Sequence, residues 1–405
     1  MNDKIISRIY QLILILFSIE YIGDGVLSVY RLIIFPLVCI CLILLFSKPK
    51  QLYVSKLSIF ISIVLGWLAI CQGLLNSNIL FPLFTLPLVL CVIQFMGLKR
   101  RIVVNYSLIF SLYSIPHILS VVFNKYELLA GRFCGLHNDP NFCGIYLSIA
   151  VIGAVFYVLN RENKKFFRIL QILNIIISIL LIFWTGSRGC MLIFLLVIAF
   201  YFYSSKKIYA AVKILITCCA IYSYFYIVSY IESLPIWVDP DVDLIDSILC
   251  RFQSDKMEGG SHRTLLWQTA FSEMEANSAY IIPIGSEYAM RSTPNGYAHN
   301  TFIDFLLEMG LFPGFLFDMV IFITILKSCK IIFNKKNNDE MLLLIFLSLL
   351  VLFQLFFLSA YSQKITWLAI VLLFSSSRNK RLLKNDTFNN NSYVQRGEIS
   401  REVHS

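Results

Sequence analysis

Charged residues are scarce in this chain. Of its 405 residues only 14% are charged, whereas 58% are hydrophobic. Apolar runs of about 20 residues, the length that a helix needs to cross a bilayer, recur along the whole sequence. They leave almost no chain for the two or three soluble domains that the length alone would suggest. The sequence therefore predicts an all-α polytopic membrane protein.

Motifs that hold metals or nucleotides are also missing. The sequence has no CxxC pair, no Walker or dinucleotide fingerprint and no internal repeat. Most of the eleven cysteines lie inside apolar runs, where we expect them to act as small packing residues. The carboxylates of 239–246 alternate, but this stretch lacks the glycine and the final glutamate of a calcium loop. We predict neither a metal nor a cofactor.

The apolar runs predict about twelve transmembrane helices, with a range of 11–13. The run at 300–326 is unusual, because its first part is amphipathic and "FPGF" interrupts it, so we expect a partly re-entrant element followed by a true span. The predicted spans are 5–22, 29–47, 54–75, 78–98, 102–123, 139–159, 167–185, 188–204, 208–230, 300–326, 341–358 and 361–377.

The predicted organisation has four parts. Residues 1–230 hold nine spans, 231–298 form one long loop with short helices, 299–377 hold three spans, and 378–405 form a disordered tail. The first span has a basic start but no small-residue cleavage site after it, so we expect it to remain uncleaved.

Lysine and arginine gather in alternate loops, which predicts the orientation. The rich loops lie near 4–8, 48–56, 99–101, 161–168, 206–207, 327–336 and 378–384. The other short loops carry only Arg31, Lys125, Arg132, Arg188 and Lys364. Because the cytoplasmic side keeps the excess of positive charge, both termini are predicted to be cytoplasmic and the long loop external. This orientation also accounts for the net charge of +10, so no nucleic-acid partner is inferred.

Polar groups stand at three points where a predicted external loop meets a helix. The stretches are "GRFCGLHNDPN" with Arg132 and Asp139, "TGSRGC" with Arg188, and "GYAHNTFIDFLLEMG" with His299. In the first, Asp139 is expected to cap the helix, with Pro140 at its first position. Helix N-termini attract anions, and a neighbouring arginine adds a forked donor that suits phosphate oxygens.

A fourth stretch, "GGSHRTLLWQTAFSEMEAN", predicts a helix inside the long loop. Trp267, Ala270, Phe271 and Met274 form an apolar stripe, and Arg263 lies one turn before Trp267 on it. We expect Arg188 and Arg263 to build an anion site. The alternative is that Arg188 is an interface anchor and Arg263 a simple cation–π pair.

His299 is the best candidate for proton transfer, because imidazole titrates near neutral pH. Asn300, Asp304 and Glu308 follow at intervals of four residues and share one helix face beside it. They are expected to orient the base or to bind hydroxyls. The alternative is an interfacial amphipathic helix whose polar stripe faces water and whose His-Asn pair forms a cap.

These stretches, in this order, resemble the O-antigen polymerase and O-antigen ligase superfamily of bacterial envelope glycosyltransferases. The resemblance rests on "GLHNDPN", "TGSRG", "SHRTLLWQTA" and "YAHNTFIDFLLEMGLFPG" and covers most of the chain. It implies a GT-C-like, inverting, metal-independent enzyme of the bacterial inner membrane, working at the periplasmic face on glycans linked to undecaprenyl diphosphate. It also implies that Arg188 and Arg263 bind the diphosphate and that His299 is the general base, with Arg132 and Asp139 as looser matches. We expect Arg132, Asp139, Asn300, Asp304 and Glu308 to be secondary substrate-binding residues.

Within that superfamily we expect a polymerase, which joins lipid-linked repeat units. The alternatives are a ligase, which transfers the glycan to lipid A-core, and a lipid-linked oligosaccharide flippase. A flippase would be expected to carry charges at mid-span depth and to lack a long external loop. The partners implied are the lipid-linked donor and acceptor, the bilayer, a chain-length regulator and a flippase.

Overall fold

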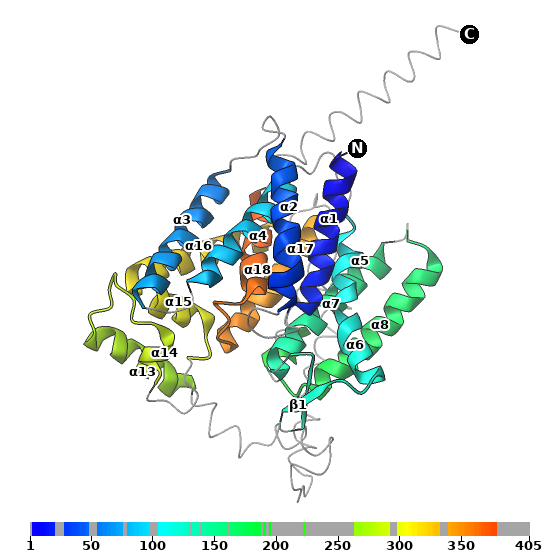
Figure 1. The fold of residues 1–405 in the computed structure, drawn as a ribbon. Helices are drawn as coiled ribbons and strands as arrows, with labels where there is room; N and C mark the ends of the chain where they lie inside the picture. Colours follow the sequence, from blue (N-terminus) through cyan, green and yellow to red (C-terminus); the bar gives the residue numbers. More distant parts are fainter. Residues whose placement is uncertain are drawn as a thin grey trace, which may run out of the picture.

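A computed structural model shows a mostly helical protein (Figure 1). All predicted spans outside 188–230 fall on helical segments, while 188–204 and 208–230 lie almost wholly outside the described residues. The number twelve therefore stays a prediction. The structure describes residues 2–20, 28–47, 55–75, 79–97, 104–129, 131–137, 139–160, 163–187, 189–191, 194–195, 222, 263–291, 298–332 and 339–378.

Most helices of the predicted spans begin and end within a few residues of the predicted boundaries. The first part contains α1 (Asn2–Leu16), η1 (Phe17–Ile19), η3 (Tyr30–Ile34), α2 (Phe35–Phe46), α3 (Lys56–Leu74), α4 (Leu80–Gly97), α5 (Tyr106–Ser111), η5 (Leu112–Ser114), α6 (Ile115–Val122), β1 (Glu127–Leu129), β2 (Arg132–Gly135), α7 (Pro140–Leu159) and α8 (Lys165–Trp184). The second contains α13 (Arg263–Ala276), α14 (Ser286–Ala289), α15 (Thr301–Met309), α16 (Leu311–Ile332), α17 (Asp339–Gln354), η7 (Leu355–Phe357) and α18 (Lys364–Arg378).

The long apolar helices differ in the share of their residues that is buried inside the protein. Within the described residues, four candidate spans are long and apolar enough to cross a membrane, and several shorter apolar helices accompany them. In the best apolar windows of the helices at 140–159 and 339–357, 78% and 72% of the residues are buried, against 22% for the window at 165–184. The exposed side chains of this last helix, α8, include Phe166, Leu173 and Leu180. Such an exposed apolar surface suits contact with lipid, so α7 and α17 form the core and α8 the periphery of an integral membrane protein.

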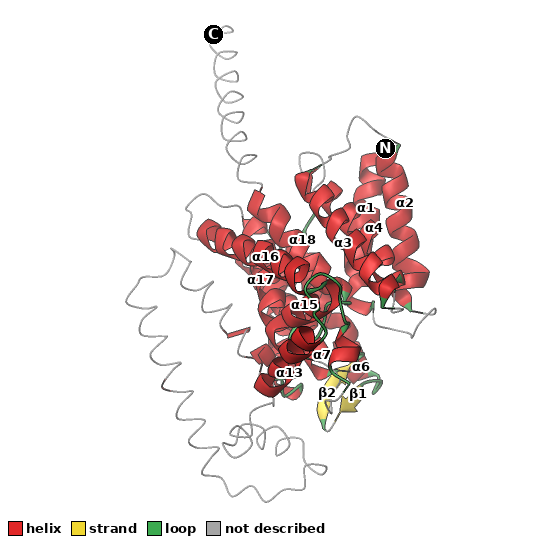
Figure 2. Ribbon diagram, turned by 90° about the vertical axis from the view of Figure 1, so that its left-hand side faces the viewer, coloured by secondary structure: helices red, strands yellow, loops and turns green. Residues whose placement is uncertain are grey.

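A short β-hairpin departs from the all-α prediction. Strands β1 and β2 pair antiparallel, with Leu129 opposite Arg132. They lie at the same end of the molecule as α13 and α14, as two views at right angles show (Figures 1 and 2). We call this the loop end. Residues 127–135 show no alternating apolar pattern, so the sequence does not predict these strands.

The predicted span at 300–326 is broken into two helices. The break falls at Gly310, where φ is +90°, and separates the nine-residue α15 from the 22-residue α16. The span is interrupted as predicted, but the predicted position was wrong, because "FPGF" lies inside α16 and the break comes before it, at Gly310. The re-entrant element followed by a true span stays a prediction. A side chain at Gly310 would collide with the main chain of Ile281, and one at Gly314 would come within 2.7 Å of the carbonyl oxygen of Phe305.

Segment 279–285 of the long loop covers this break. The amides of Leu311 and Phe312 donate to the carbonyls of Ala279 and Tyr280, at 2.9 and 2.8 Å. In return the amide of Gly285 donates to the carbonyl of Leu307 at 3.0 Å. These bonds satisfy main-chain groups that the broken helix leaves open, which is a strict requirement near a bilayer. The loop is thereby attached to the membrane helices by main-chain bonds.

Gly310→Ala is expected to destabilise the protein by about 2 kcal/mol or more, because it combines a positive φ with a clash against Ile281. Thermal unfolding in detergent measures the loss. Gly66→Ala in α3 is the matched control, because a side chain there would meet nothing within 4 Å. Equal unfolding temperatures for the two variants would contradict the role of the break.

Candidate functional site

Helix α13 packs against α15 and the residues before it through one face. Leu266, Ala270 and Met274 are buried, and together with Ala298, Leu307 and their neighbours they form a second core beside the main one. The predicted stripe was partly wrong, because Phe271 is 48% exposed. Leu266, Ala270 and Met274 are four residues apart and therefore share one helix face, and Phe271 lies off this face.

Arg263 is the first residue of α13, and its guanidinium lies over an aromatic ring. The sequence predicted that this ring would be Trp267, one turn along the helix. The structure places the ring of Phe357 there instead, 5.1 Å from the guanidinium carbon. Phe357 ends η7, so a cation of the long loop contacts the segment between α17 and α18.

Thr301 holds the segment that follows Phe357. Its hydroxyl donates to the carbonyl of Leu358 at 2.6 Å and accepts from the amide of Ala360 at 2.9 Å. Thr301 is the first residue of α15 and comes two residues after His299. The ring under Arg263 and the loop that carries His299 are therefore parts of one hydrogen-bonded arrangement.

His299 lies half-buried between two anchored residues. Trp267 donates its indole N–H to the carbonyl of Ala298 at 3.0 Å. Asn300 caps α15, because its side-chain oxygen accepts from the amides of Phe302 and Ile303. His299 itself adopts a left-handed backbone conformation with φ at +51°, which is uncommon for a residue other than glycine. Helix α13 thus fixes both Arg263 and the backbone beside His299.

The surroundings of His299 keep its imidazole neutral. Burial lowers its pKa from the ordinary value, the positive charge of Arg263 lowers it further, and the carboxylate of Asp139 partly opposes this. The structure therefore brings together three predicted site residues from distant parts of the chain. A neutral imidazole near pH 7 is the form that accepts a proton.

Asp139 has the capping position that the sequence predicted. Its carboxylate accepts from the amide of Asn141 at 2.6 Å, and Pro140 is the first residue of α7. The capping bond occupies one side of the carboxylate, while its charge still acts on His299. Asp139 is thus both a helix cap and a charge of the site.

Arg132 joins two of the predicted stretches. Its Nε donates to the carbonyl of Thr185 at 2.8 Å, and its Nη2 donates to the side-chain oxygen of Asn141 at 3.2 Å. The same oxygen accepts from the hydroxyl of Ser187 at 2.7 Å. The turn that carries Arg188 is therefore attached to the start of α7. Arg188 itself lies outside the described residues, as does the whole of 231–262.

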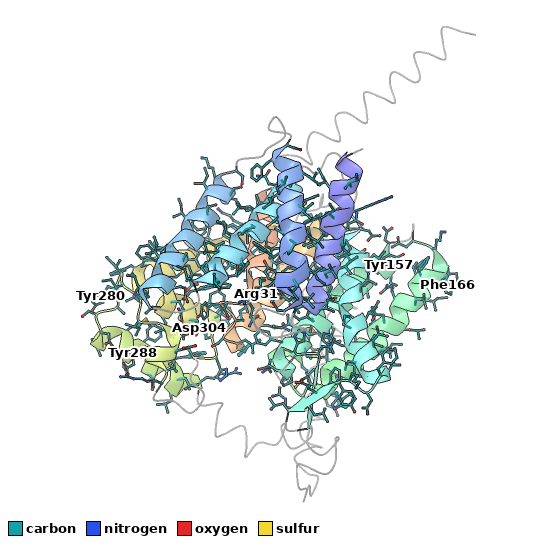
Figure 3. All side chains as sticks on the ribbon, in the orientation of Figure 1. Arg31, Tyr157, Phe166, Tyr280, Tyr288 and Asp304 are labelled. Atoms are coloured by element: carbon teal, nitrogen blue, oxygen red, sulfur yellow. The ribbon has the colours of Figure 1, made fainter. Side chains whose placement is uncertain are left out.

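Asn300, Asp304 and Glu308 are buried on one face of α15, so the reading of a polar stripe that faces water was wrong. Glu308 accepts from the amide and hydroxyl of Ser286 and from the side-chain amide of Gln72. It joins α14 and α3 to α15. Asp304 is fully buried and lies inside the protein, whereas Tyr280 and Tyr288 lie on the outside (Figure 3).

Sequence reasoning missed Asn141 and Phe357. Asn141 belongs to the stretch "HNDPN", so the pairing of Asp139 with a second polar residue two positions on was a usable signal. Phe357 carried no signal, because it is one of 34 phenylalanines and contacts Arg263 across 94 positions of the chain. Within the described residues, no group of three or more His, Cys, Asp or Glu is arranged to hold a metal ion.

Fold and site define an integral membrane protein with a cationic, histidine-bearing centre at its loop end. Residues 173–317 match the family model described as O-antigen ligase, which confirms the resemblance to the O-antigen polymerase and ligase superfamily. The match includes Arg188, Arg263 and His299, whereas Arg132 and Asp139 precede it. A search of curated proteins finds no match.

The charges around His299 predict opposite effects of two substitutions on its titration. Arg263→Gln removes the charge that lowers the pKa of His299, so this pKa should rise. Asp139→Asn removes the charge that raises it and keeps a capping side chain, so the pKa should fall. The pH dependence of His299 modification by diethyl pyrocarbonate, followed by peptide mass spectrometry, measures both shifts. Shifts in the same direction would contradict the arrangement.

Proposed function

We propose that this protein is an O-antigen polymerase that joins repeat units linked to undecaprenyl diphosphate. The observation that supports it best is that the positive charge of Arg263 and the carboxylate of Asp139 both act on the half-buried imidazole of His299. A cation and a neutral base are the two groups that an inverting transfer from a diphosphate needs when no metal takes part. The family match to 173–317 supports the reaction class.

The proposed reaction is a single displacement. A hydroxyl of the acceptor sugar attacks the anomeric carbon of the donor and forms the new glycosidic bond. The bond from that carbon to the diphosphate oxygen breaks, and the electron pair leaves with undecaprenyl diphosphate. His299 takes the proton of the hydroxyl, and Arg263 and Arg188 neutralise the departing diphosphate.

The wider setting completes the proposal. The enzyme lies in the inner membrane with about twelve GT-C-like spans, both termini in the cytoplasm and 231–298 in the periplasm. Arg132, Asp139, Asn300, Asp304 and Glu308 shape the site. The hydrogen bonds of Arg132 and Glu308 favour a positioning role for these two residues, because each side chain joins separate segments of the chain near the proposed site. A chain-length regulator and a flippase are the protein partners expected.

Ligase activity is the second candidate, because the matching family model is described as O-antigen ligase. Both reactions use the same donor and the same departing diphosphate. They differ in the acceptor, which is a lipid-linked repeat unit for the polymerase and lipid A-core for the ligase.

His299→Ala should abolish chain extension while the protein still accumulates in the membrane, because the acceptor hydroxyl loses its base. The readouts are the surface polysaccharide ladder and an immunoblot of the membrane fraction. His404→Ala, near the end of the chain, is the control and should leave the ladder unchanged. Polysaccharide chains of normal length in the His299 variant would contradict the assignment of His299 as the base.

A deletion strain separates the candidate activities. Loss of a polymerase should leave a single repeat unit on the lipopolysaccharide core. Loss of a ligase should leave bare core and accumulated lipid-linked polymer. Bare core with lipid-linked units retained at the cytoplasmic face would point to a flippase and would overturn the proposal.

A further inference from the structure

A cavity of about 520 Å³ lies between α3, α16 and α18, at the end of these helices opposite the candidate site. Its walls are mostly apolar and are formed by Leu57, Phe60, Val320, Ile323 and Phe374. The ring of Phe60 lies 6.2 Å from that of Phe374, which shows how closely α3 and α18 approach there. The cavity is distinct from the proposed active site, because it lies at the start of α3, whereas Trp67 in the later half of α3 donates to the carbonyl of Met309 at the end of α15.

Two lysines line this apolar cavity. Lys56 is the first residue of α3, and Lys327 lies five residues before the end of α16. Thr324 and Ser377 line it as well, but their hydroxyls donate to the carbonyls of Val320 and Phe374 within their own helices. The lysine ammonium groups are therefore the donors that could bind a phosphate. Within this cavity the two cations are combined with walls that suit hydrocarbon.

The cavity has the surroundings of a lipid site. From Lys327 its lining follows α16 back to Val320, which is seven residues or roughly 10 Å of helix. The faces of α3 and α16 beside it expose large apolar side chains: Ile59, Ile63, Phe322 and Leu326 are each about half or more exposed. A water-facing surface would not carry such a patch, so the cavity borders the hydrocarbon of the bilayer.

Charge complementarity selects the occupant. Both lysines belong to the loops whose positive charge predicts the cytoplasmic side, and the lipids of that leaflet are anionic. We propose that the groove between α3, α16 and α18 binds an anionic diacyl phospholipid of the cytoplasmic leaflet, with its phosphate between Lys56 and Lys327 and one acyl chain along Phe60 and Val320.

Native mass spectrometry of the full-length protein, titrated with phosphatidylglycerol or phosphatidylcholine in detergent, tests this. The protein should retain phosphatidylglycerol in preference to phosphatidylcholine. The double variant Lys56→Gln, Lys327→Gln should lose that preference by about tenfold, because each lysine near an anionic lipid contributes to binding. Lys330→Gln is the matched control, since this exposed lysine is on the same helix end but does not line the cavity, and it should behave as the unaltered protein.

A filling variant tests the apolar part separately. Ile323→Trp keeps both lysines but occupies the groove, so retention of phosphatidylglycerol should fall. In a separate competition, soluble glycerol phosphate should displace little of the lipid from any variant.

Equal retention of both lipids by the unaltered protein and the double variant would overturn the proposal. Full competition by glycerol phosphate would do so too, because a free phosphate would then be the ligand. Dimers that disappear in the double variant would assign the groove to a second copy of the chain.

Discussion

The structure at the loop end depends on one requirement, that the main-chain groups freed by the break at Gly310 find partners. A helix broken near a membrane cannot leave its amides and carbonyls open. The chain meets this requirement with segment 279–285, which bonds to Leu307, Leu311 and Phe312. The long loop is thereby fixed on the membrane helices, and α13, which precedes this segment, is fixed with it. The position of Arg263, at the start of α13, thus depends on the main-chain hydrogen bonds around Gly310.

The candidate site shows the same principle at the level of side chains. Its charged groups come from segments far apart in the chain, and several of the hydrogen bonds that hold those segments together join uncharged groups. Trp267 holds the residue before His299, and Thr301 holds the segment after Phe357. Asn141 joins the start of α7 to the turn at Ser187. Because these anchors carry no charge, they do not compete with an anionic ligand for Arg263.

The sequence predicts whatever depends on neighbours within one helix turn. The caps at Asp139 and Asn300, the interrupted span and the face shared by Asp304 and Glu308 all follow from local spacing. What it could not predict depends on pairs far apart. The burial of Glu308 is fixed by Ser286 and Gln72, and the ring under Arg263 comes from Phe357. The residues next to Glu308 or Arg263 in the sequence do not indicate these distant partners. The spacing of Asp304 and Glu308 is therefore the same whether their carboxylates are buried or face water.

Arg263 has two opposed effects in the proposed reaction. Its charge stabilises a diphosphate that leaves, yet the same charge lowers the pKa of His299 and so weakens the base. The conflict is resolved if the donor binds first, because the diphosphate then neutralises Arg263, and the pKa of His299 rises toward its ordinary value. Asp139 acts in the same direction at all times. On this reasoning the imidazole becomes a stronger base only when the donor is in place, which ties proton removal to a bound donor.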